Sequence, residues 1–137
     1  MKAQTLIRWM LVPCLSLPVF ADVAVITHPS NATSLTADDV QRLFLGKNKS
    51  FPGGGEATPV SNKNDAVREQ FNQVLLGKNE SQIKAYWSQL VFTGKGTPPK
   101  ELDSDDAVKQ FVANNPTAIG YIDAAKVDGS VKVVLKQ

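Results

Sequence analysis

The stretch that decides the fold is residues 59–71, which read P-V-S-N-K-N-D-A-V-R-E-Q-F. A short apolar run leads into a polar turn, and the spacing of Val67 and Phe71 then predicts a helix. A strand that enters a helix through a tight polar turn is typical of α/β proteins. The first backbone N–H groups of such a helix and the positive end of its dipole make the turn a candidate anion site.

Short β-branched runs and amphipathic helices alternate along the rest of the chain. Strands are expected at residues 23–27, 58–61, 118–122 and 131–135. Helices are expected to begin at Thr36, at Asn64, at Asn79, and at Asp103 or Ser104. Their apolar stripes are Val40, Leu43 and Phe44; Val67, Phe71, Val74 and Leu75; Ile83, Tyr86, Trp87, Leu90 and Val91; and Val108, Phe111 and Val112. This order predicts an α/β domain with a mixed or mainly parallel sheet of about four to five strands, flanked by helices.

Residues 1–21 have the pattern of a secretion signal. Lys2 and Arg8 precede an apolar stretch that ends at Ala21, and this stretch is too short to span a bilayer. We therefore predict a signal peptide over residues 1–21 and a single domain over residues 22–137. The protein is then periplasmic or secreted, with no membrane insertion after the signal is removed.

Charge and composition exclude several function classes. The chain has 15 basic and 13 acidic residues, and loss of Lys2 and Arg8 with the signal leaves 13 of each. A neutral domain has no basic field for nucleic acid. Cys14 is the only cysteine and lies in the signal, so no disulfide is expected. With one histidine besides, we expect no metal and no cofactor. No G-x-S-x-G motif is present, and an enzyme is the least favoured class.

Three runs carry a family resemblance. They are S-L-T-A-D-D-V-Q-R-L-F-L-G-K at 34–47, the opening stretch, and P-T-A-I-G-Y-I at 116–122. Together they resemble the phosphate-type solute-binding proteins of bacterial ABC transporters, which have the type 2 periplasmic-binding fold. The short, one-lobe secreted proteins of this type are more similar still, because they also carry a segment like Y-W-S to P-P at 86–99.

The resemblance implies a non-enzymatic solute-binding-like protein with a single lobe. Full-length relatives clamp the anion between two α/β lobes, and this chain matches roughly the second. A chain with one wall of the cleft is expected to bind weakly, to dimerise, or to do something else.

The family pattern also implies a degenerate anion site. In relatives the turn carries an Arg, then Ser-Gly-Thr, a second Arg and an aromatic residue. The matching positions here are Ser61, Asp65, Ala66, Val67, Arg68 and Phe71. A carboxylate only accepts hydrogen bonds, and it repels an anion by about 4 kcal/mol at about 4 Å. A helix terminus offsets only roughly 0.3–1 kcal/mol of this. Tight phosphate binding is therefore not expected.

Two interpretations of the turn remain open. If it binds a ligand, the candidate residues are His28, Ser61, Asn62, Asn64, Asp65 and Arg68. His28 is included because it follows a strand, and ligands gather at the carboxyl ends of strands. The simpler interpretation is a well-capped helix start, with Asn64 as the cap and Asp65, within reach of Arg68, filling the positive helix end. His28 is then a loop residue before a proline-fixed turn.

Other residues have both a structural and a functional interpretation. Lys47, Lys49 and Lys95 lie on glycine-rich loops, where they are either solvated or able to bind an anion. Tyr86 and Trp87 fall on an inward stripe and are expected in the core, although an exposed Trp87 would indicate a contact surface.

Two functions follow from the sequence. The first is a secreted solute-binding-like domain that takes a small anion or another small solute. The second is an interaction module that docks on a second copy or on a membrane transporter or sensor.

Overall fold

The computed structural model describes residues 22–137, so the predicted signal peptide lies outside the described residues. The strands are β1 (Val23–Thr27), β2 (Thr58–Asn62), β3 (Lys100–Leu102), β4 (Ala118–Asp123) and β5 (Lys132–Lys136). The helices are α1 (Ala37–Phe44), α2 (Asp65–Phe71), α3 (Glu80–Phe92) and α4 (Asp105–Asn114), with a π-helical turn at Asn72–Leu76 and a 3-10 turn at Ala124–Lys126.

Side-chain caps set where the helices begin. Thr36 and Asn79 each form a capping box, with Asp39 and Gln82 respectively, as the sequence predicts. Ser104, and not Asp103, caps α4 by accepting a hydrogen bond from the N–H of Ala107.

The five strands form one mixed sheet in the order β3-β2-β4-β1-β5. β2 runs parallel to both β3 and β4, whereas β1 is antiparallel to both β4 and β5. The predicted mixed α/β architecture is therefore confirmed. β3 is not predicted by the sequence pattern, because this strand has three residues, K-E-L, with little apolar pattern.

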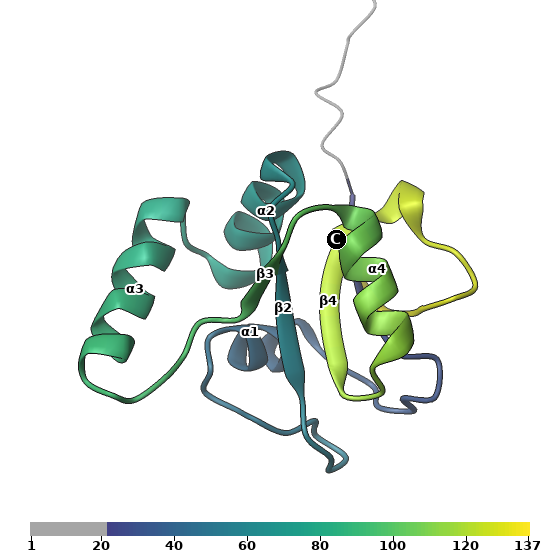
Figure 1. Cartoon of the computed structure of the whole chain (residues 1–137), viewed down its shortest axis with the longest axis horizontal. Helices are drawn as coiled ribbons and strands as arrows, with labels where there is room; N and C mark the ends of the chain where they lie inside the picture. The colour runs from purple at the N-terminus through teal and green to yellow at the C-terminus, as the bar shows by residue number, and fades with distance from the viewer. Residues whose placement is uncertain (1–21) are drawn as a thin grey trace, which may run out of the picture.

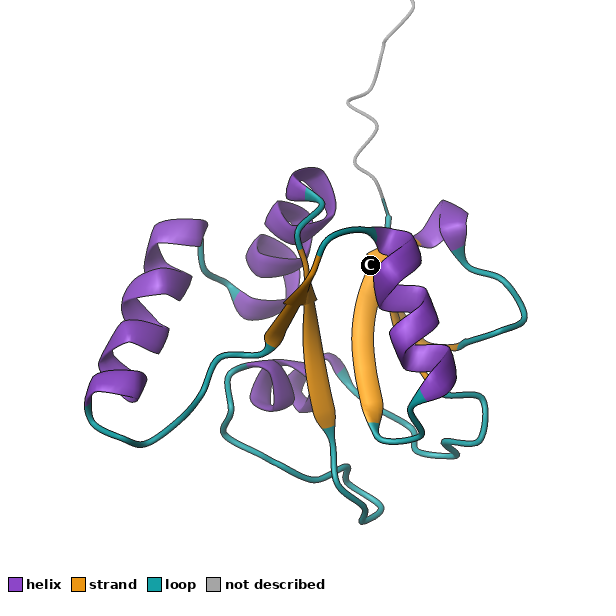
Figure 2. Cartoon of the chain, viewed as in Figure 1, coloured by secondary structure: helices purple, strands orange, loops and turns teal. Residues whose placement is uncertain are grey.

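Helices cover both faces of the sheet (Figures 1 and 2). Side chains alternate along β1, so that Val23 and Val25 face α1 and α2, while Ala24 and Ile26 face α4. α4 adds Val108 and Val112 to its side of the core.

Two apolar stripes differ from their predicted form. Val74 is 48% exposed, because the π-helical turn widens the helix and brings Leu76 inward in its place, beside Leu75, which is buried as predicted. α3 stands to one side of the sheet (Figure 1), so its stripe is only partly covered. Trp87 is buried as predicted, but Val91 is 53% exposed. No helix within residues 22–137 is long and apolar enough to cross a membrane.

Candidate functional site

The turn between β2 and α2 is fixed by hydrogen bonds within the turn and to β3. The N–H of Lys63 donates to the carbonyl of Leu102 at 2.9 Å, which holds the turn against β3. The N–H of Asn64 donates to Oδ1 of Asn62, also at 2.9 Å. The conformation of the turn is therefore held by bonds within the protein and does not require a ligand.

Asn62 is the centre of this turn. It is fully buried, and its Nδ2 donates both to Oδ1 of Asp105 and to the carbonyl of Tyr121 at 3.1 Å. Its backbone N–H donates to the Tyr121 hydroxyl oxygen at 3.2 Å. Since a buried polar group is costly unless it is paired, these bonds account for a polar side chain in the core.

Asp105 supplies a buried carboxylate beside the turn. It is 4% exposed and lies in the first turn of α4, where the helix dipole favours a negative charge. Its Oδ2 accepts a hydrogen bond from Nδ2 of Asn64 at 3.0 Å, so each carboxylate oxygen has an asparagine donor. An anion that entered here would meet a negative charge that already holds the nearest amide donors.

This arrangement differs from the predicted one. Asn64 is at the N-cap position of α2, but its side chain makes no capping hydrogen bond because its amide turns to Asp105. The buried carboxylate at the turn comes from Asp105, not from Asp65, whose side chain is 90% exposed. One signal in the sequence points to Asp105: it lies three and seven residues before Val108 and Val112, on the apolar face of α4.

Two carboxylates already neutralise the positive charge of Arg68. Its Nη2 lies 3.0 Å from Oδ1 of Asp65, which confirms the predicted contact, and its Nε lies 3.5 Å from Oε2 of Glu80. Glu80 belongs to α3, and its contact with Arg68 was not predicted from the sequence. Within this cluster Arg68 has little net positive charge to offer a further anion.

Ser61 belongs to the same region through Tyr121. The two hydroxyl groups lie 2.9 Å apart, and the Tyr121 ring stacks on Phe71 with centroids 3.8 Å apart. Burial raises the pKa of the Tyr121 phenol above its ordinary value, while its hydrogen bonds with Asn62 and Ser61 lower it to a smaller extent. Tyr121 therefore remains a neutral hydroxyl that connects β2 to β4.

His28 lies at the opposite end of the sheet from the other candidates. Thr27, just before it, pairs with Ile119, and Ile119 also pairs with Pro59 near the start of β2. β1 is antiparallel to β4, so its carboxyl end is far from the β2–α2 turn. Nδ1 of His28 lies 2.7 Å from Oγ of Ser30 and accepts from the Ser30 N–H at 3.1 Å. The remaining candidates, Ser61, Asn62, Asn64, Asp65 and Arg68, lie together.

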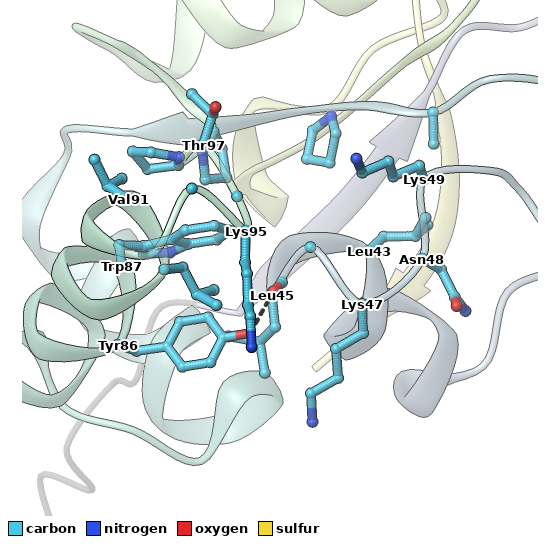
Figure 3. A pocket seen from close by; sticks show the side chains of 18 residues that line it. Leu43, Leu45, Lys47, Asn48, Lys49, Tyr86, Trp87, Val91, Lys95 and Thr97 are labelled. Atoms are coloured by element: carbon cyan, nitrogen blue, oxygen red, sulfur yellow. Dashed lines mark hydrogen bonds between the residues drawn. The ribbon is translucent and has the colours of Figure 1, made fainter.

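A separate groove, which we call the α3 groove, has a volume of about 880 Å³. One wall comes from α3 and its following loop, within residues 86–99, and the other from residues 43–49 with Ala57 and Pro59. Figure 3 shows Tyr86 and Trp87 on the first wall and Lys47 to Lys49 on the second. Within residues 22–137, no three His, Cys, Asp or Glu side chains gather as a metal site.

Several solved structures share this fold. A phosphate ABC transporter substrate-binding protein from Clostridium perfringens, solved with bound phosphate, is 25% identical and superposes with a TM-score of 0.66 over 84% of this chain. The fold is that of one lobe of a phosphate-type substrate-binding protein. An ABC-type phosphate transport receptor from Vibrio cholerae is 19% identical, with a TM-score of 0.64 over 84% of the chain. A possible phosphate-binding protein from Planctomyces limnophilus is 13% identical, with a TM-score of 0.50 over 77%.

The chain spans less than half the length of each of these proteins, namely 45%, 46% and 37%. The resemblance inferred from the sequence is therefore confirmed at the level of a solute-binding fold. No family model matches the chain, and no curated protein matches it.

Proposed function

We propose that residues 22–137 form an exported, non-enzymatic solute-binding-type domain that has lost tight phosphate binding at the β2–α2 turn. The predicted signal at residues 1–21 supports export to the periplasm. The similarity to phosphate-type substrate-binding proteins supports a binding role rather than a chemical one.

The observation that carries the proposal is that the charged and amide side chains at the turn are already paired with other groups of the protein. Asp105 accepts hydrogen bonds from Asn62 and Asn64, and Arg68 contacts both Asp65 and Glu80. Phosphate would have to displace these partners and would gain only a partly screened cation. The turn is therefore better suited to holding itself together than to holding an oxyanion.

Calorimetry with inorganic phosphate tests this proposal. The native protein is expected to show no binding below millimolar concentration. The double variant Asp65→Asn/Glu80→Gln releases Arg68 from both ion pairs, and we expect it to bind phosphate about tenfold more tightly than the native protein.

The matched control is Asp38→Asn/Glu56→Gln, which changes the net charge equally at positions away from the turn. It should leave the weak phosphate response unchanged. Micromolar phosphate binding by the native protein, abolished by Arg68→Ala, would contradict the proposal.

One observation favours a second function, docking on another copy of the chain. Phe92, at the end of α3, is 92% exposed, and Val91 beside it is more than half exposed. Exposed apolar side chains next to each other often mark a protein contact.

On this alternative, sedimentation shows a dimer that Phe92→Ser weakens by at least about tenfold. Val74→Ser removes an exposed apolar side chain elsewhere and should leave the dimer intact. A monomer at all concentrations excludes self-docking.

A further inference from the structure

Close packing and a hydrogen bond hold the two walls of the α3 groove in place. Trp87 lies between two glycines: a Cβ added at Gly46 would come within 3.0 Å of the indole, and one at Gly96 within 3.4 Å. Gly46 also has φ of +72°, a conformation that favours glycine. The hydroxyl of Tyr86 donates to the carbonyl of Leu45 at 2.5 Å, which ties α3 to the opposite wall. The base of the groove is thus fixed by both walls.

Lysines reach the groove from both of its walls. Lys47 and Lys49 come from the loop after α1, and Lys95 comes from the loop after α3 (Figure 3). The backbone that carries them is anchored, because the N–H of Lys47 donates to Arg42 O at 2.9 Å and that of Lys95 to Leu90 O at 2.8 Å. Among the residues that the structure describes, those lining the groove include no Asp or Glu. Three positive charges in one lining that holds no acidic side chain favour the binding of an anion.

The rest of the lining is mainly apolar. Leu90 and Val91 of α3, together with Pro59 and Pro98, present carbon surface around the charged rim. A volume of about 880 Å³ falls within the ordinary range for small-molecule pockets and is far larger than one inorganic oxyanion requires. The lining therefore suits a ligand with an apolar body, and its charge suits an anionic group on that body.

We propose that the α3 groove binds a small organic anion, a carboxylate carried on an aromatic or other compact apolar body. The apolar body contacts the α3 wall near Val91, and the carboxylate lies between Lys95 and Lys47. This site is separate from the β2–α2 turn, and it goes beyond the function proposed above.

Nuclear magnetic resonance with 2-naphthoate as the probe tests the proposal. In the purified protein, titration should shift the amide signals of Gly46, Gly94 and Gly96 and the indole N–H of Trp87, all of which are in the groove. Signals of Asn62 and Asn64 at the β2–α2 turn should not move. 2-Naphthalenemethanol has the same rings without the charge, and it should bind at least about threefold more weakly.

Charge variants identify the residues that recognise the carboxylate. Lys95→Gln and Lys47→Gln should each weaken 2-naphthoate binding by about threefold, and the double variant by about tenfold. Lys84→Gln is the matched control, because Lys84 is an exposed lysine of α3 outside the groove lining, and it should have no effect. Val91→Ser should weaken both naphthalene probes by about threefold through lost apolar contact.

Three results would overturn the proposal. They are equal binding of the charged and neutral probes, shifts confined to residues outside the groove, and binding to phosphatidylglycerol vesicles without any response to free 2-naphthoate. Inorganic phosphate is titrated in parallel. Shifts at Asn62 and Asn64 with phosphate would contradict the proposed function of the turn and leave the groove result standing.

Discussion

Replacing Asp105 with alanine is expected to lower the free energy of unfolding by about 3 kcal/mol. The carboxylate is 4% exposed and accepts one hydrogen bond from Asn62 and one from Asn64. Its loss leaves a buried N–H of Asn62 without a partner, and a hydrogen bond to a charged group is worth roughly 1.5–3 kcal/mol. Urea unfolding followed by circular dichroism gives the difference directly.

Asp106→Ala is the matched control. Asp106 is the next residue in the first turn of α4, but its side chain is mostly exposed and its nearest cation, Lys109, is 4.0 Å away. Both variants lose an acidic residue near the helix N-terminus, so their difference isolates the buried network. The control should cost no more than about 0.5 kcal/mol. Equal losses in the two variants would show that Asp105 acts only through the helix dipole.

The Asp105 network also bears on function. The three elements that meet at the turn, β2, β4 and α4, are joined there by hydrogen bonds to one asparagine and one carboxylate. A protein that bound phosphate at this place would need those donors free for its ligand. The same side-chain amides cannot serve both phosphate and the protein interior. In this chain they donate to Asp105 and so contribute to stability.

Local signals in the sequence were enough to predict most of the fold. Caps at Thr36 and Asn79 depend on residues within three positions, and β-branched runs mark β1 and β4. These interactions are short in range, so a sequence pattern records them directly. The predicted strand at 131–135 is present one residue later, as β5.

The candidate site depended on contacts that no local pattern contains. Asn62 and Asp105 are 43 residues apart, and Arg68 meets Glu80 only because α3 begins near the end of α2. The position of His28 depended on strand direction, and composition does not reveal whether β1 runs parallel or antiparallel. Strand direction and contacts between residues far apart in the chain therefore could not be predicted from the sequence pattern.

α3 shows a different limit. Its stripe of Ile83, Tyr86, Trp87 and Val91 has the spacing of a helix packed on a core, yet Val91 is largely exposed. Periodicity predicts which face of a helix is apolar and does not tell what covers that face. In this chain part of the stripe lines the α3 groove instead of a core, which is why that groove is the second candidate for ligand binding.

Gly120→Val is expected to lower the free energy of unfolding by about 3 kcal/mol or more. Gly120 lies in β4 beneath α4, where an added Cβ would come within 2.6 Å of Cγ1 of Val108 and 3.0 Å of Cγ2 of Val60. Side chains in this part of the core are fully buried, so the strand or the helix must shift to admit the new atoms. Denaturant unfolding measures the loss.

Two further variants separate overpacking from the general effect of replacing a glycine with valine. Gly129→Val, in the turn before β5, adds the same atoms where nothing lies within 4 Å, and it should change stability by no more than about 0.5 kcal/mol. Val108→Ala makes room for the new side chain, so the pair Gly120→Val/Val108→Ala should be more stable than the summed single effects by at least about 1 kcal/mol. Strict additivity would show that the close approach of α4 to β4 is not what requires glycine in the A-I-G-Y-I segment. The A-I-G-Y-I segment is part of one of the three runs that carry the family resemblance. A coupling of the expected size would mean that packing against α4 explains its glycine without any role in ligand binding.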